Sequence, residues 1–163
     1  MRQAILSILV DNSAGVLSRV AGLFSRRGYN IESLTVGSTQ NPKLSRMTVA
    51  VVGDDDVLEQ IQKQLSKLVD VREVIELPSD ASVCKELILV KVQASEKDRQ
   101  SIIAIADIFR AKIVDVSNDS MVMELTGNQN KLNAFTNLLE GFKITEIART
   151  GLTGLARGSA NLK

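Results

Sequence analysis

Along the first third of the chain, stretches with the apolar pattern of a strand flank one stretch whose apolar residues have helical spacing. Residues 5–10 (ILSILV) form a short apolar run that is typical of a strand. Residues 16–27 carry apolar side chains at helical spacing, with polar residues on the opposite face. Residues 31–37 and 45–52 again indicate strands, joined through a turn at TQNP. The pattern predicts the order strand, helix, strand, strand.

A second helix and a fourth strand complete this half, and the same order then repeats. A helix face follows Gly53, and residues 71–77 (VREVIEL) close the half as a strand. After a Ser/Asp-rich stretch, residues 86–94 begin the second series as a strand. The remaining elements expected there are a helix ending near Phe109, strands at 112–117 and 121–126, a helix over 132–142 and a strand at 143–149.

The pattern therefore predicts an α+β protein made of two ferredoxin-like βαββαβ domains. We place the first domain at residues 1–78, a linker at 79–85 and the second domain at 86–163. The glycine-containing tail of the second domain is expected to be extended or mobile unless a partner orders it. Each sheet would leave one face and its edge strands in need of cover, which pairing with another subunit can supply.

Composition narrows the function classes. The 163 residues carry a net charge of +1, so no broad surface for nucleic acid or anionic membranes is expected. No apolar segment is long enough to span a membrane, and the start of the chain does not resemble a signal peptide. The single cysteine, Cys84, excludes an intrachain disulfide and favours a cytoplasmic protein.

The absence of histidine is the most informative count. It excludes Ser-His-Asp and Cys-His nucleophile pairs within this chain, and one cysteine cannot build a Cys-rich metal site. Aromatic residues make up only 3% of the chain, which leaves little for a base-stacking RNA surface. We therefore expect no catalytic residues and no metal site, so composition argues against an enzyme.

The segment VDNSAGVL (residues 10–17) is the main candidate site. If a helix begins near Gly15, its free N–H groups favour an anion such as a carboxylate, and glycine lets a ligand approach the backbone. Asn12 offers a donor and an acceptor, suited to the charged ends of an amino acid. The same residues also fit a plain connection in which Asn12 or Ser13 caps the helix. The sequence alone leaves both interpretations open.

Other polar residues have one structural and one functional interpretation each. Asn30 is either an ordinary turn residue or a ligand contact from a neighbouring subunit. The acidic run 54–56 fits a helix start better than a divalent-metal site, because its spacing lacks the calcium-loop pattern. Arg149 and Arg157 could contact a partner protein or a phosphate, or be solvated.

Four stretches carry a resemblance to a known family. They are GVLSRVAGLFSRRGYNIESLTVG (15–37), LSRMT (44–48), VLEQIQKQLSKLVDV (57–71) and ARTGLTGLARG (148–158). Together they resemble the small, regulatory subunit of acetolactate (acetohydroxyacid) synthase, over essentially the whole chain. That family implies an N-terminal ACT domain and a C-terminal ACT-like domain. ACT domains pair side by side into homodimers and bind amino acids at the subunit interface.

The resemblance also implies a ligand and the residues that hold it. The ligand is typically valine, sometimes with leucine or isoleucine, acting by feedback inhibition of branched-chain amino-acid biosynthesis. One subunit would supply the loop between the first strand and the first helix, and the second subunit would supply the start of the second strand. The matching positions are Asn12, Ala14, Gly15, Val16 and Leu17 in the loop, and Asn30 and Ile31 at the strand.

The large subunit of that family is a separate chain that carries the catalysis. It uses thiamine diphosphate, magnesium (Mg2+) and FAD, so the resemblance implies no cofactor in this chain and a role as the allosteric partner that activates the large subunit. The alternative is a free-standing ACT-type amino-acid sensor that controls another enzyme or a transcription factor. Neither interpretation involves nucleic acid or membrane binding by this chain.

Overall fold

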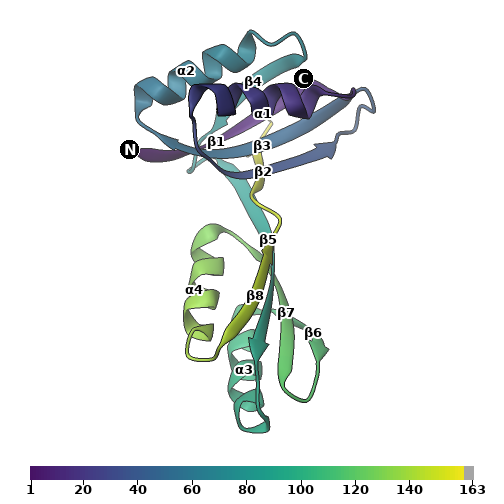
Figure 1. Cartoon of the computed structure of the whole chain (residues 1–163), viewed down its shortest axis with the longest axis vertical. Helices are drawn as coiled ribbons and strands as arrows, with labels where there is room; N and C mark the ends of the chain where they lie inside the picture. Colours follow the sequence, from purple (N-terminus) through teal and green to yellow (C-terminus); the bar gives the residue numbers. More distant parts are fainter. Residues whose placement is uncertain (160–163) are drawn as a thin grey trace. The chain divides into compact units, whose positions relative to one another are not determined.

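The computed structural model describes residues 1–159 and divides them into two compact units (Figure 1). One unit contains residues 1–83 together with the segment from Leu152, and the other contains Cys84–Gly151. Each unit is built around a four-stranded antiparallel βαββαβ arrangement, so the predicted α+β class is confirmed. No helix in the described residues is long and apolar enough to cross a membrane.

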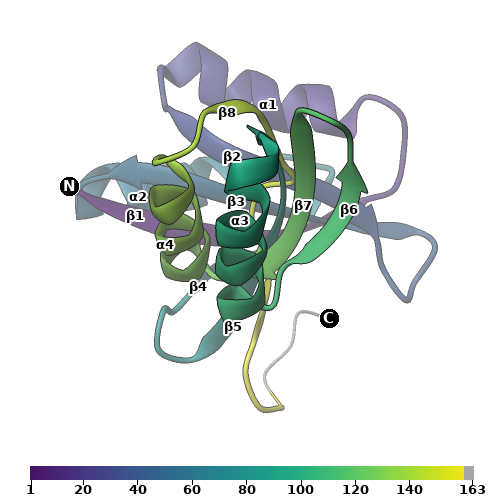
Figure 2. The same cartoon turned by 90° about the horizontal axis from the view of Figure 1, so that it is seen from below.

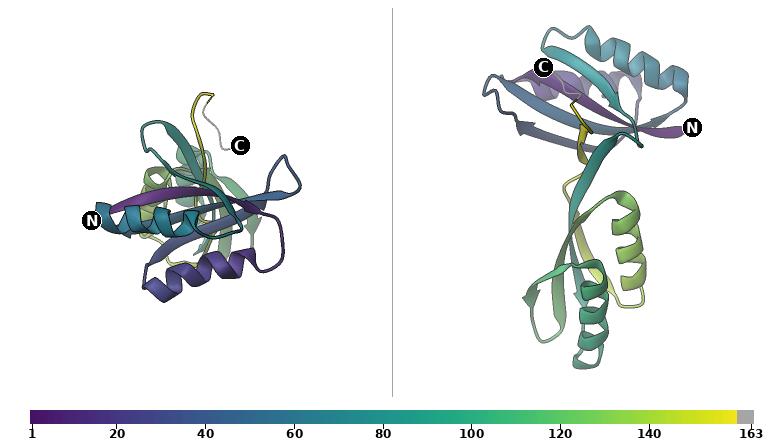
Figure 3. Two further views of the ribbon diagram at one scale, coloured as in Figure 1. Left: turned by 90° about the horizontal axis from the view of Figure 1, so that it is seen from above. Right: turned by 180° about the vertical axis from the view of Figure 1, so that it is seen from behind.

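The first unit has strand order β2-β3-β1-β4, with α1 and α2 against one face of the sheet (Figure 3). β1 and β3 pair along their full length, from Arg2 opposite Gly53 to Asp11 opposite Leu44. β2 lies at one edge, next to β3, and β4 lies at the other. The elements are β1 (Arg2–Asp11), α1 (Val16–Arg27), β2 (Ile31–Ser38), β3 (Leu44–Gly53), α2 (Asp55–Ser66), β4 (Val71–Leu77) and β9 (Thr153–Ala156).

Alternate residues of the strands build the core of this unit, because successive side chains of a strand point to opposite faces. Leu6 and Ile8 of β1 are fully buried in one core with Phe24 of α1 and Ile61 of α2. Gly28 ends α1 in the left-handed conformation (φ 69°), as the sequence predicts for a residue just past a helix.

The second unit repeats the order with β6-β7-β5-β8, and α3 and α4 cover one face of its sheet (Figure 2). Its core is separate from the first and centres on Phe135, which is fully buried and stacks edge-to-face with Phe109 at 5.4 Å. The elements are β5 (Ser82–Gln93), α3 (Glu96–Phe109), β6 (Lys112–Val116), β7 (Ser120–Gly127), α4 (Gln129–Leu139) and β8 (Ile144–Arg149).

The structure differs from the predicted bounds in two places. β5 begins at Ser82, inside the predicted linker 79–85. The tail from Leu152 has its contacts in the first unit, although the sequence assigns it to the second. A four-residue strand, β9, forms there and pairs with β5, so the described tail is extended and held by its own chain. Residues 160–163 of the predicted second domain lie outside the described residues.

Leu152 lies on the helix-free face of the first sheet. Its N–H donates to Ser33 Oγ (3.5 Å) and its carbonyl accepts from Thr35 Oγ1 (3.2 Å), and its side chain is 3% exposed. Ser33 and Thr35 stand opposite Ala50 and Thr48 of β3, which are also buried on this face. The periodicity of the sequence does not predict this contact, because the leucines of the short glycine-containing tail are too few to give a periodic signal.

Candidate functional site

The loop from β1 to α1 is shaped by a left-handed glycine. Gly15 immediately precedes α1 with φ 84° and ψ −8°, a conformation that L-residues with a Cβ rarely adopt. A Cβ built on it would lie 2.9 Å from Nη1 of Arg19, one helical turn further on. The left-handed backbone therefore favours glycine at position 15, and a side chain there would also displace the flexible end of Arg19.

The start of α1 has no side-chain cap and no acidic residue in its first turn. The other three helices of the described residues have side-chain hydrogen bonds at their starts: Asp54 accepts from Val57 N (2.9 Å), Asn128 accepts from Lys131 N (2.9 Å), and Asp98 accepts from Ser95 at the start of α3. The first N–H groups of a helix have no partner within the helix and carry partial positive charge. The start of α1 is thus suited to an external anion.

Asn12 does not cap the helix, and this corrects one of the two interpretations from the sequence. Its backbone N–H donates to the Lys43 carbonyl (2.8 Å), and its Nδ2 donates to the Pro42 carbonyl (3.0 Å). Asn12 instead ties the loop to the turn between β2 and β3. Ala14 and Leu17 are exposed beside it, whereas Val16 is buried in the core.

Two arginines near the loop form ion pairs with aspartates of the same chain. Arg19 Nε donates to Asp70 Oδ2, and this hydrogen bond raises the pKa of Arg19. Arg72 Nε donates to Asp11 Oδ1 at 2.6 Å, at the end of β1. Arg19 is a site residue that the periodicity of the sequence does not single out, although its position four residues after Gly15 places it over the loop in any helix that begins there.

Asn30 and Ile31 lie at the opposite end of α1 in the same chain. A helix of twelve residues spans about 18 Å at 1.5 Å per residue. The strands agree, because Ile31 stands opposite Val51 near one end of β3, whereas Asp11 stands opposite Leu44 at the other. One chain therefore brings Asn12, Ala14, Gly15, Val16 and Leu17 together, and does not bring Asn30 and Ile31 to them.

The remaining candidates have structural partners. Asp54 caps α2, and Asp55 pairs with Arg2 (2.8 Å). Arg149 pairs with the buried Glu86 (3.0 Å), and Arg157 Nε donates to the Ser82 carbonyl (3.2 Å). Within the described residues, no group of three or more Cys, Asp and Glu is placed to hold a metal ion.

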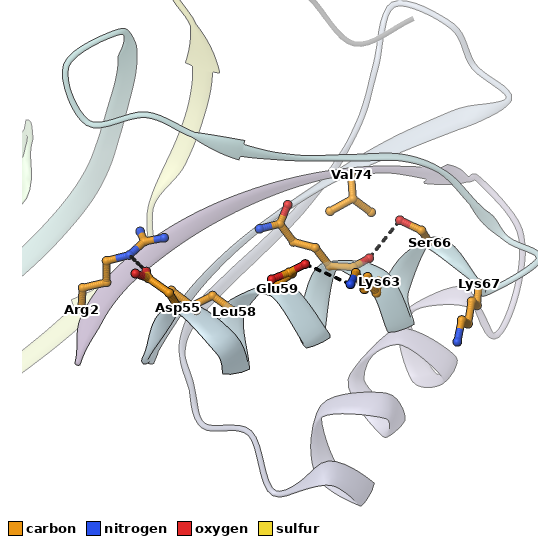
Figure 4. A pocket seen from close by; sticks show the side chains of 9 residues that line it. Arg2, Asp55, Leu58, Glu59, Lys63, Ser66, Lys67 and Val74 are labelled. Carbon is orange, nitrogen blue, oxygen red and sulfur yellow. Dashed lines mark hydrogen bonds and ion pairs between the residues drawn. The ribbon is translucent and has the colours of Figure 1, made fainter.

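A shallow hollow of about 590 Å³ runs along α2 between Arg2 and Val74 (Figure 4). Four of its charged side chains already have ion-pair partners: Asp55 and the neighbouring Glu76 bind Arg2 and raise its pKa, and Glu59 pairs with Lys63 at 2.9 Å. Because these four charges are already compensated, they are poorly suited to selecting a charged ligand.

Family models and curated relatives match this chain over most of its length. One family model, described as an AHAS small subunit-like ACT domain, matches residues 6–73, and a second, the small subunit of acetolactate synthase, matches residues 85–158. The probable acetolactate synthase small subunit of Methanothermobacter thermautotrophicus is 53% identical over 159 residues, covering 97% of this chain and 95% of that protein. The chain belongs to the acetolactate synthase small-subunit family.

Two further relatives extend this likeness. The small subunit of acetolactate synthase isozyme 3 from Escherichia coli is 53% identical over 155 residues, covering 94% of this chain and 95% of that protein. The crystal structure of an acetolactate synthase small subunit from Thermotoga maritima matches with a TM-score of 0.89 and 43% identity, covering 98% of this chain and 100% of the other. The first unit is accordingly an ACT domain, and the loop at Gly15 belongs to it.

Proposed function

We propose that this chain is the non-catalytic, regulatory subunit of an acetolactate synthase, and that it binds valine at the start of α1. In this proposal two copies pair through their ACT domains, and the bound valine makes the large subunit sensitive to the end product of its pathway. The name of the family supports a large subunit as the partner. Thiamine diphosphate, Mg2+ and FAD would be bound by that large subunit.

The observation that carries the proposal is the uncapped start of α1 at Gly15. The carboxylate of valine would accept from the N–H groups of residues 15–17, where the helix dipole favours negative charge. Arg19, whose Nε is bonded to Asp70, places Nη1 of its guanidinium beside the same glycine. The isopropyl group would contact apolar side chains such as Leu17, which is 47% exposed in the single chain.

The geometry of β2 supports a site shared between two copies. β2 is an edge strand, and a two-fold axis would pair it antiparallel with β2 of a second copy. Such pairing puts the Ile31 end of one strand beside the Ser38 end of the other. The Ser38 end is where Asn12 bonds to the turn at Pro42 and Lys43. Asn30 and Ile31 of the second copy would then complete the pocket.

The second unit is our candidate for the contact with the large subunit. The helix-free face of its sheet has a hollow of about 490 Å³ in which Leu89 and Ile147 are 38% and 41% exposed. Exposed apolar surface of this kind is typical of protein interaction sites. Valine can alter the large subunit only if it binds one state of the complex more tightly than another, and a coupling of about 1–3 kcal/mol is typical of such regulation.

The test is to combine this chain with the large subunit and titrate valine while following acetolactate formation. We expect this chain to raise the activity and valine to lower it again. No change in activity on mixing would remove the assignment as a regulatory subunit. Valine binding by calorimetry without any effect on the synthase would favour the alternative, a free-standing ACT-type sensor.

A further inference from the structure

Arg46 of β3 differs from the other arginines that lie within the strands of the described residues. Its side chain lies on the helix-free face of the first sheet, where Nη1 donates to Oγ of the fully buried Ser7 at 2.7 Å. Arg46 is half-buried, yet no carboxylate of the described residues lies within ion-pair distance of it. The arginines that do hold a carboxylate are Arg2, Arg19, Arg72 and Arg149. The guanidinium of Arg46 therefore retains unused donors.

A hollow of about 400 Å³ adjoins this guanidinium. Residues 35–40 at the end of β2 line one side, and Thr153 and Leu155 of β9 line another. Gly37 stands directly opposite Arg46, and a Cβ placed on Gly37 would meet no atom within 4 Å. Because Gly37 has no side chain, no side chain of β2 lies between Arg46 and the outer edge of the sheet at this position.

We propose that Arg46 forms an ion pair with Glu32 of the partner subunit, across Gly37, when two copies pair through β2. This rests on the β2 pairing of the proposed function and adds a specific contact to it. The register that overlaps all eight residues of both β2 strands brings residues 31–32 of one copy beside residues 37–38 of the other. The two-fold axis forms the contact twice per dimer.

Glu32 is suited to this role by charge and by position. It is the only charged residue of β2. In the single chain it is exposed, and its carboxylate accepts from Gln3 Nε2 at 2.6 Å, which is a neutral donor. Gln3 belongs to the residues of β1 that alternate with the core-facing ones, so the carboxylate reaches the same helix-free face as Arg46. Exchange of an exposed neutral partner for a half-buried guanidinium favours the pair.

The test is a charge exchange in the full-length protein, with sedimentation equilibrium as the readout. We expect Arg46→Glu and Glu32→Arg each to weaken the dimer about tenfold, because two like-charge contacts replace two ion pairs. The double variant should return to within about threefold of the wild type, since the pairs re-form with reversed polarity. Glu140→Arg, an exposed glutamate of the second unit, is the control for the charge change alone.

Folding defects do not explain the expected result. Arg46→Glu also loses the bond to Ser7, but the double variant has the same defect, so its recovery must come from the restored pair. Glu32→Arg leaves that bond intact. Thermal unfolding of each variant measures any remaining loss of stability.

Three results would overturn the inference. The first is a double variant whose dimer is no tighter than that of the weaker single variant, and the second is a wild-type protein that stays monomeric. The third is an Arg46→Glu protein that dimerises normally but loses phosphate binding, which would make the hollow a small-anion site. Calorimetry with valine on the same proteins keeps this separate from the proposed function. If the double variant does not regain its dimer affinity but valine binds normally, only the ion pair is contradicted. If the double variant regains its dimer affinity but valine does not bind, only the effector role is contradicted.

Discussion

The two units share an order of elements but differ where the first strand meets the first helix. In the ACT domain, four residues ending in a left-handed glycine join β1 to α1, and no side chain closes the helix start. In the second unit only Ala94 and Ser95 join β5 to α3. There the carboxylate of Asp98 accepts from Ser95 N–H (3.4 Å) and from Ser95 Oγ (3.0 Å). The second unit thus supplies from its own chain a negative charge at the helix start, and the first unit supplies none.

The helix-free faces differ as well. Leu152 lies on the first sheet and is held between Ser33 and Thr35, whereas Leu89 and Ile147 stay partly exposed on the second. One fold is therefore used in two ways: the ACT domain keeps a helix end open and covers its sheet, and the second unit closes the helix end and leaves its sheet open. Topology alone does not decide which unit carries a site.

The largest expected effects come from removing the central aromatic residue of either core. Phe24→Ala and Phe135→Ala should each destabilise their own unit by about 3–5 kcal/mol, because both rings are fully buried. The two cores share no residue, so only Phe24→Ala should abolish valine binding. Calorimetric unfolding and valine titration measure both effects. Equal loss of valine binding in Phe135→Ala would contradict the independence of the units.

The covered and open faces give the next prediction. Leu152→Ala should lower the stability of the first unit by about 2–5 kcal/mol, because a fully packed leucine is removed. Leu89→Ala, the matched change on the open face, should lower stability by less than about 1 kcal/mol, since the side chain is 38% exposed. Chemical denaturation of both variants tests the difference. Equal effects would mean that Leu152 contributes no more than the exposed leucine.

Gly15→Asp addresses the open helix end itself. We expect valine affinity to fall about 100-fold, because the substitution puts a side chain on a left-handed backbone and a negative charge where the proposed site would hold the carboxylate of valine. The control is Gly141→Asp, which places the same side chain after α4, where the Cβ meets only one carbonyl oxygen at 4.0 Å. Wild-type affinity in Gly15→Asp would remove this loop from the site.

Most of the fold follows from the sequence because its signals are local. Alternation and helical spacing locate the four helices and the eight longer strands of residues 1–159, and Gly28 marks a helix end through its own backbone preference. β9 was missed because its four residues are defined by partners far along the chain. The placement of the tail depends on the hydroxyls of Ser33 and Thr35, and no local pattern indicates such a contact.

The candidate site was predictable in part for the same reason. Gly15 is visible because a glycine between a strand and a helix indicates a left-handed backbone or the close approach of a ligand, and the family resemblance then gives its neighbours. The role of Asn12 was not visible, since an asparagine before a helix suits a cap as well as a bond to a distant turn. Arg46 shows no signal in the sequence, because its lack of a carboxylate partner among the described residues is a property of the packed sheet.

The smallest expected effects compare the two helix starts directly. Asp98→Ala should destabilise the second unit by about 1 kcal/mol, because it removes the carboxylate that closes α3, and should leave valine binding unchanged. Asn12→Ala should change stability by less, since Asn12 caps no helix, yet it should weaken valine binding because it loosens the loop from Pro42. Denaturation measures the loss of stability and calorimetry the loss of valine affinity in both variants. If the difference between the helix starts is functional, Asp98→Ala loses more stability and Asn12→Ala loses more valine affinity. If the difference is only structural, the same variant shows the larger loss in both measurements.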